Sequence, residues 1–331
     1  NIKVDREENP EIDNIYMTAT QMMTGHGGWP LNVICLPDGR PVYGGTYHTN
    51  SQWIEVLKKI QKLYENDKIQ LDTFAEKVEK GIQKVNRFEY TKQIPPFETE
   101  MLQNEMVYWS KNWDTINGGE QQNQKFITPV KLNYIQQYQH LNNDPKISAY
   151  FKRTLENIAN SGVVEHLKGG FYRYTVDPEW KFPHFEKMLY DNAQLMTLYS
   201  NAYKEIKNPL FKSTVYQTFY FLKKRMRNTK GAFYAAIDAD NNQGEGRYYV
   251  FSTEEIKKIA GNDLALLQDF YRIDLEHPFE ESFHHLRQTD NLGGFLKKHA
   301  ISSNQLNQKR DAWEVQFETL KCQREFPLVD T

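Results

Sequence analysis

The sequence predicts two domains of different class: a partial α+β domain over residues 1–92 and an all-α domain of paired helices over 101–331. Three observations support this division. Residues 25–47 hold glycines, a Trp-Pro pair and two short apolar runs around a Pro-Asp-Gly turn, which indicates a β-hairpin. The stretch "QIPPFETE" at 93–100 contains two adjacent prolines, which indicate a linker. Beyond it, long amphipathic helices dominate.

The order of elements in the first domain is typical of the second half of a thioredoxin-like fold. In that fold a cis proline opens the central antiparallel hairpin, and Pro30 stands at this place. Because proline has no N–H to donate, it belongs before the strand ladder rather than within it. The predicted elements are a short strand at 2–4, a helix at 11–23, strands at 31–36 and 42–43, and helices at 51–64 and 71–85.

The second domain reads as repeated helical hairpins. Short loops of small residues followed by aromatics recur about every 50–60 residues, as in "KGGFYRY" and "KGAFYAA", a spacing typical of paired helices. Ser252 and Glu255 form a capping-box pattern at the start of one helix. The predicted helices lie at 101–112, 129–141, 147–161, 185–205, 209–227, 253–260 and 303–321.

Composition narrows the class of protein. The chain of 331 residues has 41 basic and 43 acidic residues, and no segment is basic enough to predict a nucleic-acid or anionic-membrane partner. No apolar run reaches membrane-spanning length. Cys35 and Cys322 are far apart and show no zinc spacing, so we expect no disulfide framework, no metal site and a reducing, cytoplasmic setting. Cys35 lies in a predicted strand, where a buried inert thiol is the expectation.

Four strings resemble the thioredoxin-domain family that includes spermatogenesis-associated protein 20. They are "VDREENPEIDNIYM", "GGWPLNV" with "LPDGRPVYGGTY", "GGFYRYTVDPEWKFPHFEKMLYDNAQL" and "GAFYAAIDADNNQGEGRYYVFSTEEI". The resemblance covers residues 1 to about 260. It implies a thioredoxin-like domain followed by an (α/α) barrel similar to that of N-acylglucosamine 2-epimerases and six-hairpin glycosidases. It implies a carbohydrate or polyol substrate and no organic cofactor, and it leaves the reaction open.

The chain departs from the family pattern in three places. A Cys-X-X-Cys-type motif would precede the "VDREE" strand, so we expect no dithiol exchange from this chain. The family's "GGFG…PKFP" loop is replaced here by "GGEQQNQKFITP" at 118–129. The helices after residue 101 are fewer than six hairpins need. These departures indicate an internal fragment with a partial barrel.

The densest polar stretch is "WKFPHFEKMLYDN" at 180–192. If it opens a helix, His184, Lys187 and Asp191 share one face, while Glu186 and Tyr190 share another. Histidine transfers protons near neutral pH, and a neighbouring carboxylate orients its ring. We therefore predict His184 as the proton carrier, with Asp191 or Glu186 as its partner. The alternative is a polar helix start with a structural role.

The second candidate stretch is "AIDADNNQGEGRYY" at 236–249. Asp238 and Asp240 alternate as on a strand and would supply the second acid–base group. A solvated acidic turn is the alternative. A calcium loop is disfavoured because the order of oxygen ligands does not match an EF-hand. The adjacent His284 and His285 would point to opposite sides of a regular element, which argues against a shared metal.

Further residues are candidates for substrate binding by stacking or polar contact, and core packing is the equally weighted alternative for the aromatic ones. They are Tyr172, Arg173, Trp180, Lys187, Tyr190, Phe233 and Tyr234. The leading hypothesis is acid–base chemistry on a sugar-like small molecule in a barrel cavity. The other hypothesis is a redox-linked interaction protein whose dithiol lies upstream of this chain. The sequence does not determine the oligomeric state.

Overall fold

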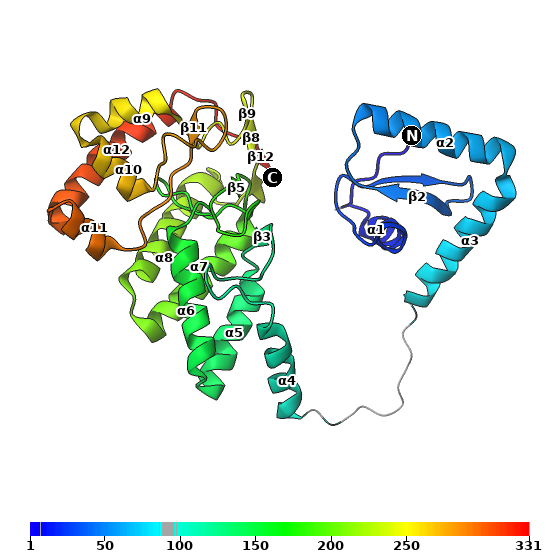
Figure 1. Ribbon diagram of the computed structural model, residues 1–331, viewed down its shortest axis with the longest axis horizontal. Helices are drawn as coiled ribbons and strands as arrows, with labels where there is room; N and C mark the ends of the chain where they lie inside the picture. The colour runs from blue at the N-terminus through cyan, green and yellow to red at the C-terminus, as the bar shows by residue number, and fades with distance from the viewer. Residues whose placement is uncertain (7, 86, 88–95, 97, 331) are drawn as a thin grey trace. The chain divides into compact units, whose positions relative to one another are not determined.

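The computed structural model describes residues 1–6, 8–85, 87, 96 and 98–330. The chain divides into two compact units, Asn1–Phe97 and Glu98–Thr331, and each is described by itself (Figure 1). Half of the predicted linker at 93–100 lies outside the described residues, because 93–95 and 97 are not among them.

The first unit is an antiparallel hairpin flanked by helices. Helices α1 and α3 pack on strand β2, and α2 packs on α3. The approach of β2 to α1 requires glycine at position 44, since a Cβ there would lie 2.4 Å from Oγ1 of Thr20. Its elements are α1 (Pro10–Thr24), β1 (Asn32–Cys35), β2 (Pro41–Gly45), α2 (Asn50–Asn66) and α3 (Lys68–Val85).

The entry to this hairpin has the predicted arrangement. The Trp29–Pro30 peptide bond is cis, and β1 begins two residues later at Asn32. Helix α1 ends at Thr24 and is followed by Gly25, whose φ of +80° is the left-handed conformation that glycine adopts readily after a helix. The prediction of a strand at 2–4 is wrong, because these residues are exposed and form no strand.

The second unit is mainly helical, with short strands between the helices. Helices α5 and α8 each pack on both α6 and α7, so these four helices form one bundle (Figure 1). The helices are α4 (Thr99–Ser110), α5 (Pro129–Asn142), α6 (Pro145–Asn160), α7 (Leu189–Ile206), α8 (Pro209–Phe221), the π-helix η1 (Leu222–Met226), α9 (Thr253–Ala260), the 3-10 helix η2 (Gly261–Asp263), α10 (Leu264–Tyr271), α11 (Leu292–Lys298) and α12 (Ser303–Lys321).

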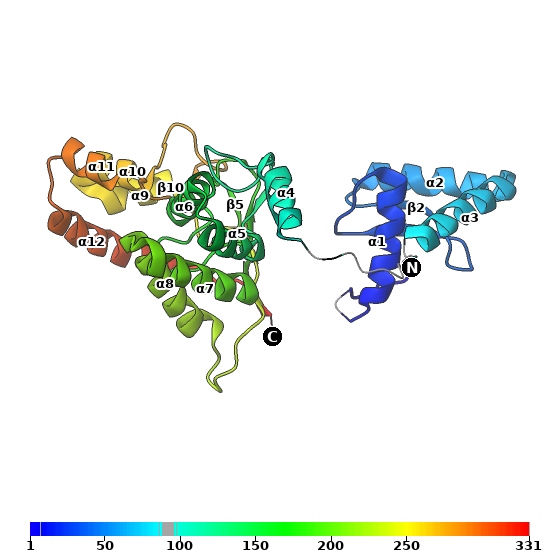
Figure 2. The same ribbon diagram turned by 90° about the horizontal axis from the view of Figure 1, so that it is seen from below.

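Local sequence accounts for where several of these helices begin. Asp144 and Asn208 each precede a proline, and their side chains accept hydrogen bonds from the first backbone N–H groups of α6 and α8. Capping boxes at Ser252 and Ser302 begin α9 and α12. Helices α9, α10, α11 and α12 gather around a second apolar core and lie together in the views of Figures 1 and 2.

The short strands join distant parts of the second unit into small antiparallel sheets. One sheet has the order β3-β4-β5 and another has the order β12-β7-β6, and two further pairs are β8-β9 and β10-β11. The strands are β3 (Lys125–Phe126), β4 (Tyr174–Thr175), β5 (Pro183–His184), β6 (Lys187–Met188), β7 (Ala236–Ile237), β8 (Asp240–Asn241), β9 (Gly244–Glu245), β10 (Phe251–Ser252), β11 (Phe283–His284) and β12 (Val329–Asp330).

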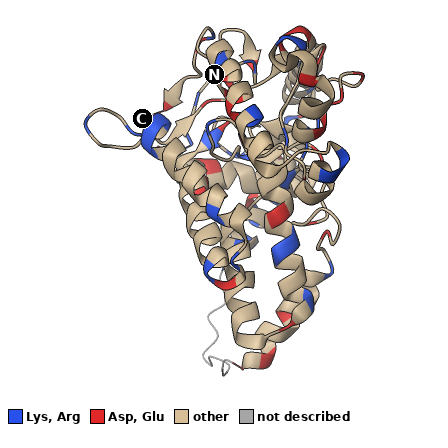
Figure 3. Cartoon of the chain, turned by 90° about the vertical axis from the view of Figure 1, so that its left-hand side faces the viewer, with Lys and Arg blue, Asp and Glu red and all other residues tan. Residues whose placement is uncertain are grey.

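One predicted helix begins later than expected. The pattern predicted a helix over 185–205, but α7 begins at Leu189. Residues 183–188 are instead drawn into the sheets, because β5 pairs with β4 and β6 pairs with β7. Acidic and basic residues are mixed along the helices on the side shown in Figure 3, in agreement with the small net charge.

Candidate functional site

The candidate site is built on the extended segment 183–188. Side chains of an extended chain alternate between two faces. Phe185 and Lys187 are buried, whereas His184 and Glu186 are partly exposed on the other face. The prediction that His184, Lys187 and Asp191 share a helical face is therefore wrong. His184 and Glu186 instead share a face because the segment has a period of two residues.

The His184 imidazole lies between two carboxylates. Its Nδ1 is 2.7 Å from Oε1 of Glu245, and its Nε2 is 3.9 Å from Oε2 of Glu186. The ring stacks on Tyr174, with centroids 4.8 Å apart and planes inclined by 19°. The β4–β5 register places these two residues opposite each other. A carboxylate at Nδ1 and an aromatic ring on one side hold the imidazole in a fixed orientation.

Arg173 and Asp191 extend this cluster. Arg173 Nη1 donates to Oε2 of Glu186 at 2.7 Å, and the Arg173 backbone N–H donates to the Glu186 carbonyl at 2.9 Å. Burial raises the pKa of Asp191 to about 6, and the nearby Arg173 guanidinium opposes this increase. Asp191 therefore changes protonation state near neutral pH, as a general acid or base requires.

The second acidic stretch reaches the same cluster through the β8–β9 hairpin. Asp240 pairs in register with Glu245, which itself contacts His184. Burial raises the pKa of Asp240, and the charges of Asp238 and Glu245 raise it further. Asp238 and Asp240 are both exposed. The described residues contain no group of His, Cys, Asp and Glu side chains that would hold a metal ion.

Three predicted binding residues are corrected to core residues. Tyr172, Trp180 and Lys187 are all at most 1% exposed, so their side chains are not available to stack on or contact a ligand at the surface. Trp180 donates through its indole N–H to the Asn117 carbonyl at 3.1 Å. Their aromatic and long side chains fill the interior of the helical unit.

The remaining predicted binding residues occupy two places. Arg173 and Tyr190 lie with the cluster, and Tyr190 is 48% exposed. Phe233 and Tyr234 belong to the loop after η1, where Phe233 bridges to Arg227. His284 and His285 are both buried, and the Nε2 of His285 contacts the Gly162 carbonyl at 2.7 Å.

Sequence reasoning did not select Glu245 or Tyr174 as site residues. Glu245 is far from His184 in the sequence, and the signal for it was the turn in "DNNQGE", which folds Glu245 back against Asp240. Tyr174 follows two of the predicted binding residues, Tyr172 and Arg173, in the chain. Its role follows from the β4–β5 pairing, which no local pattern reveals.

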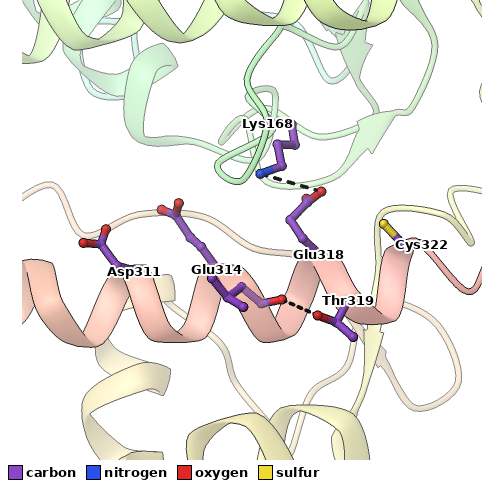
Figure 4. Close-up of a pocket in the computed structure, with 7 residues that line it drawn as sticks. Lys168, Asp311, Glu314, Glu318, Thr319 and Cys322 are labelled. Carbon is purple, nitrogen blue, oxygen red and sulfur yellow. Dashed lines mark hydrogen bonds and ion pairs between the residues drawn. The ribbon is translucent and has the colours of Figure 1, made fainter.

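Two pockets are lined by residues outside this cluster. A groove of about 530 Å³ runs along α12, where Lys168 reaches toward Glu318 (Figure 4). It is lined by Lys168, Asp311, Glu314, Val315, Glu318, Thr319 and Cys322. The first unit has an apolar pocket of about 270 Å³ beside Cys35. Burial raises the pKa of the Cys35 thiol, which disfavours the reactive thiolate.

Comparisons with known proteins agree with the sequence motifs. The family described as "Thioredox_DsbH: Protein of unknown function, DUF255" matches residues 1–83. Spermatogenesis-associated protein 20 of Homo sapiens is 32% identical in an alignment of 277 residues that covers 78% of this chain and 35% of that protein. An uncharacterized protein of Caenorhabditis elegans is 29% identical over 91% of this chain and 43% of its own length. The chain thus spans about a third to two fifths of these relatives.

One solved structure overlaps part of the backbone. Cellobiose 2-epimerase from Spirochaeta thermophila gives a TM-score of 0.37 at 17% identity, over 42% of this chain and 40% of that one. Among the described residues, no helix is long and apolar enough to span a bilayer.

The expected order of an α+β thioredoxin-like domain and an all-α domain is confirmed by the family match and by the helices of the second unit. Residues 1–83 thus match the thioredoxin-like family model, and the chain is similar to spermatogenesis-associated protein 20 across both units.

Proposed function

We propose that the cluster around His184 is an acid–base site for a small molecule of the carbohydrate or polyol class. One observation carries the proposal: the His184 imidazole lies 2.7 Å from the Glu245 carboxylate and 3.9 Å from that of Glu186. A histidine oriented by a carboxylate is a common proton-transfer unit.

The roles follow from the contacts. When the Nδ1–H group of His184 donates a hydrogen bond to the Glu245 carboxylate, the unprotonated Nε2 accepts a proton from a bound hydroxyl or C–H group. Asp191, with a pKa of about 6, supplies or receives a second proton. Arg173 holds Glu186 in place and offers N–H donors to a developing negative charge. Asp240, opposite Glu245, is an alternative second acid.

The substrate class rests on two supports. The family resemblance points to sugar-like molecules. At the cluster, Tyr174 and Phe126 pack with ring centroids 4.6 Å apart, Tyr190 is half-exposed, and charged groups stand beside them. Aromatic faces next to hydrogen-bonding side chains suit a ring that has an apolar face and polar edges.

The test is a thermal-shift screen of monosaccharides, amino sugars and polyols against the chain and against His184→Gln. A ligand of the native state raises the melting temperature, and we expect this rise to be lost in the variant. His277→Gln is the matched control, because His277 is an exposed histidine paired with Asp274 at 2.9 Å, remote from the cluster in sequence.

A positive ligand is then incubated with the chain in D2O, and NMR follows exchange of its carbon-bound hydrogens or its conversion. Exchange that depends on His184 and not on His277 supports proton transfer. Equal shifts in all three proteins, or no shift with any sugar or polyol, would contradict the proposal.

A further inference from the structure

A buried ion triad lies beneath the candidate site. One carboxylate oxygen of Glu165 accepts from the Lys187 ammonium, and the other accepts from that of Lys321. The side chains of Lys187, Lys321 and Glu165 are 0%, 2% and 8% exposed. Lys321 ends α12 and is 156 residues away from Glu165 in the sequence. The triad therefore joins the last helix of the chain to the segment that carries His184.

The charged groups of the triad have further interaction partners. Lys187 also donates to the Gly169 carbonyl at 2.9 Å, and its ammonium lies 4.5–5.0 Å from the ring centres of Tyr172, Phe221 and Tyr249. Lys321 has a second anion, Glu318, at 3.3 Å. Burial by itself raises the pKa of Glu165, but the two ammonium groups lower it to about 2, so the carboxylate stays charged.

Lys187 also occupies a junction in the backbone. It follows Glu186 directly, and it pairs in register with Ile237 of β7. Asp238 and Asp240 come immediately after Ile237, and His184 lies three residues before Lys187 on the same extended segment. Fixing Lys187 therefore fixes the extended segment that carries His184 and Glu186, and also strand β7, which precedes Asp238 and Asp240.

We infer that Glu165, Lys187 and Lys321 are positioning residues that hold segment 183–188 in the register presenting His184 and Glu186 outward. The inference rests on the proposed function, since it concerns the same site. A shift of one residue in an extended segment exchanges its two faces. It would turn His184 and Glu186 inward and would leave Glu165 without Lys187. A buried ion pair adds little net stability, and fixing one arrangement is the best-attested use of such groups.

The test uses the full chain with 13C-labelled histidine. In the parent protein the His184 Cε1–H signal carries the ring-current effect of Tyr174, and it is assigned with His184→Gln. In Lys187→Met, Glu165 keeps Lys321, so we expect a folded protein whose His184 signal moves or broadens and loses its NOE to Tyr174. The signals of His140 and His277 should stay in place.

The control is Lys168→Met. It removes an exposed lysine whose Nζ lies 3.8 Å from Glu318 of α12, the helix that also carries Lys321. It should leave the His184 signal unchanged. If Lys187→Met does not fold, the double variant Glu165→Gln/Lys187→Met removes both charges and leaves Lys321 with Glu318. A folded variant with an unaltered His184 signal overturns the inference. Loss of folding in both variants also overturns it, because the triad would then serve global stability.

The NMR measurement requires no substrate. A failed sugar screen with a displaced His184 signal would reject the proposed function and keep the positioning role. If a ligand binds the parent and a folded Lys187→Met variant equally well, and the His184 signal is unaltered, the proposed function is kept and the positioning role is rejected.

Discussion

Asp191 is a residue of the candidate site whose charge depends on its surroundings. Its carboxyl lies at the first turn of α7, partly buried beside Arg173 and Glu186. Burial disfavours the ionised form, while the guanidinium favours it, and burial has the larger effect. A single side chain thus acquires a proton affinity suited to catalysis near neutral pH.

Asp191→Asn should stabilise the protein at pH 8 and have little effect at pH 4. The native pKa of about 6 lies above the ordinary value of 3.8, so the unfolded state loses its proton first and the unfolding free energy falls as pH rises between these values. The asparagine variant escapes this loss, which is at most about 3 kcal/mol above pH 6 and is reduced by solvent screening of the partly exposed carboxyl. Urea denaturation at the two pH values measures it. If the parent and Asp191→Asn differ in unfolding free energy by the same amount at pH 4 and pH 8, Asp191 does not titrate as described.

At the scale of single elements, capping residues define where helices begin. Ser252 Oγ accepts from the Glu255 backbone N–H at 3.2 Å, and the Glu255 carboxylate accepts from the Ser252 N–H at 2.8 Å. Glu255 also accepts two hydrogen bonds from Arg324 at 2.8 and 2.9 Å. The cap of α9 therefore also anchors the chain after α12.

Ser252→Ala should lower the unfolding free energy of the second unit by about 1 kcal/mol, the usual contribution of an N-cap hydroxyl. Ser302→Ala removes the equivalent hydroxyl from α12 and should have a similar effect. Glu255→Ala should cost more than either, because it also leaves the Arg324 guanidinium, only 12% exposed, without its carboxylate. Chemical denaturation compares the three variants. Equal losses in all of them would argue against the anchoring role of Glu255.

The Glu165 carboxylate, which joins Lys187 of β6 to Lys321 of α12, predicts that the stability of the protein is acid-sensitive. The pKa of Glu165, at about 2, lies below its ordinary value of 4.5, so its contribution is fully present above pH 4.5 and is lost as pH falls through about 2. The unfolding free energy should drop by up to about 3 kcal/mol over this range. Denaturation between pH 2.5 and 6 in the parent and in Glu165→Gln tests this. The variant should be less stable at pH 6 and show a shallower slope, and parallel curves would contradict the assignment.

At the scale of the whole molecule, the two units have separate cores. The apolar clusters of the second unit contain only residues from Met106 onward. The first unit gathers Leu36, Val42, Leu71 and Ala75 into a much smaller core. Because buried apolar area is the main source of stability, the second unit should be the more stable one.

A fragment of residues 98–331 should therefore fold alone and keep any sugar-induced thermal shift seen in the full chain. Its melting temperature should lie within a few degrees of the main transition of the full chain, as measured by calorimetry. A fragment that aggregates or loses near-UV circular dichroism would show that its core needs residues 1–97.

The sequence by itself determined the features that depend on neighbours along the chain. Proline and glycine placed the hairpin after Pro30, and the capping box of Ser252 and Glu255 placed the start of α9. The candidates His184, Glu186, Asp191 and Asp240 were also named from residue type and local spacing. Turn residues, capping residues and residue types are local features, so they can be recognised without knowledge of the fold.

Only the tertiary structure decided which face each candidate occupies. Pairing with β4 and β7 made 183–188 extended, which moved Lys187 inside and kept His184 and Glu186 outside. Glu245 reached His184 across 61 residues. Such contacts join segments remote in sequence, and their energies depend on burial and strand register, which no local pattern specifies.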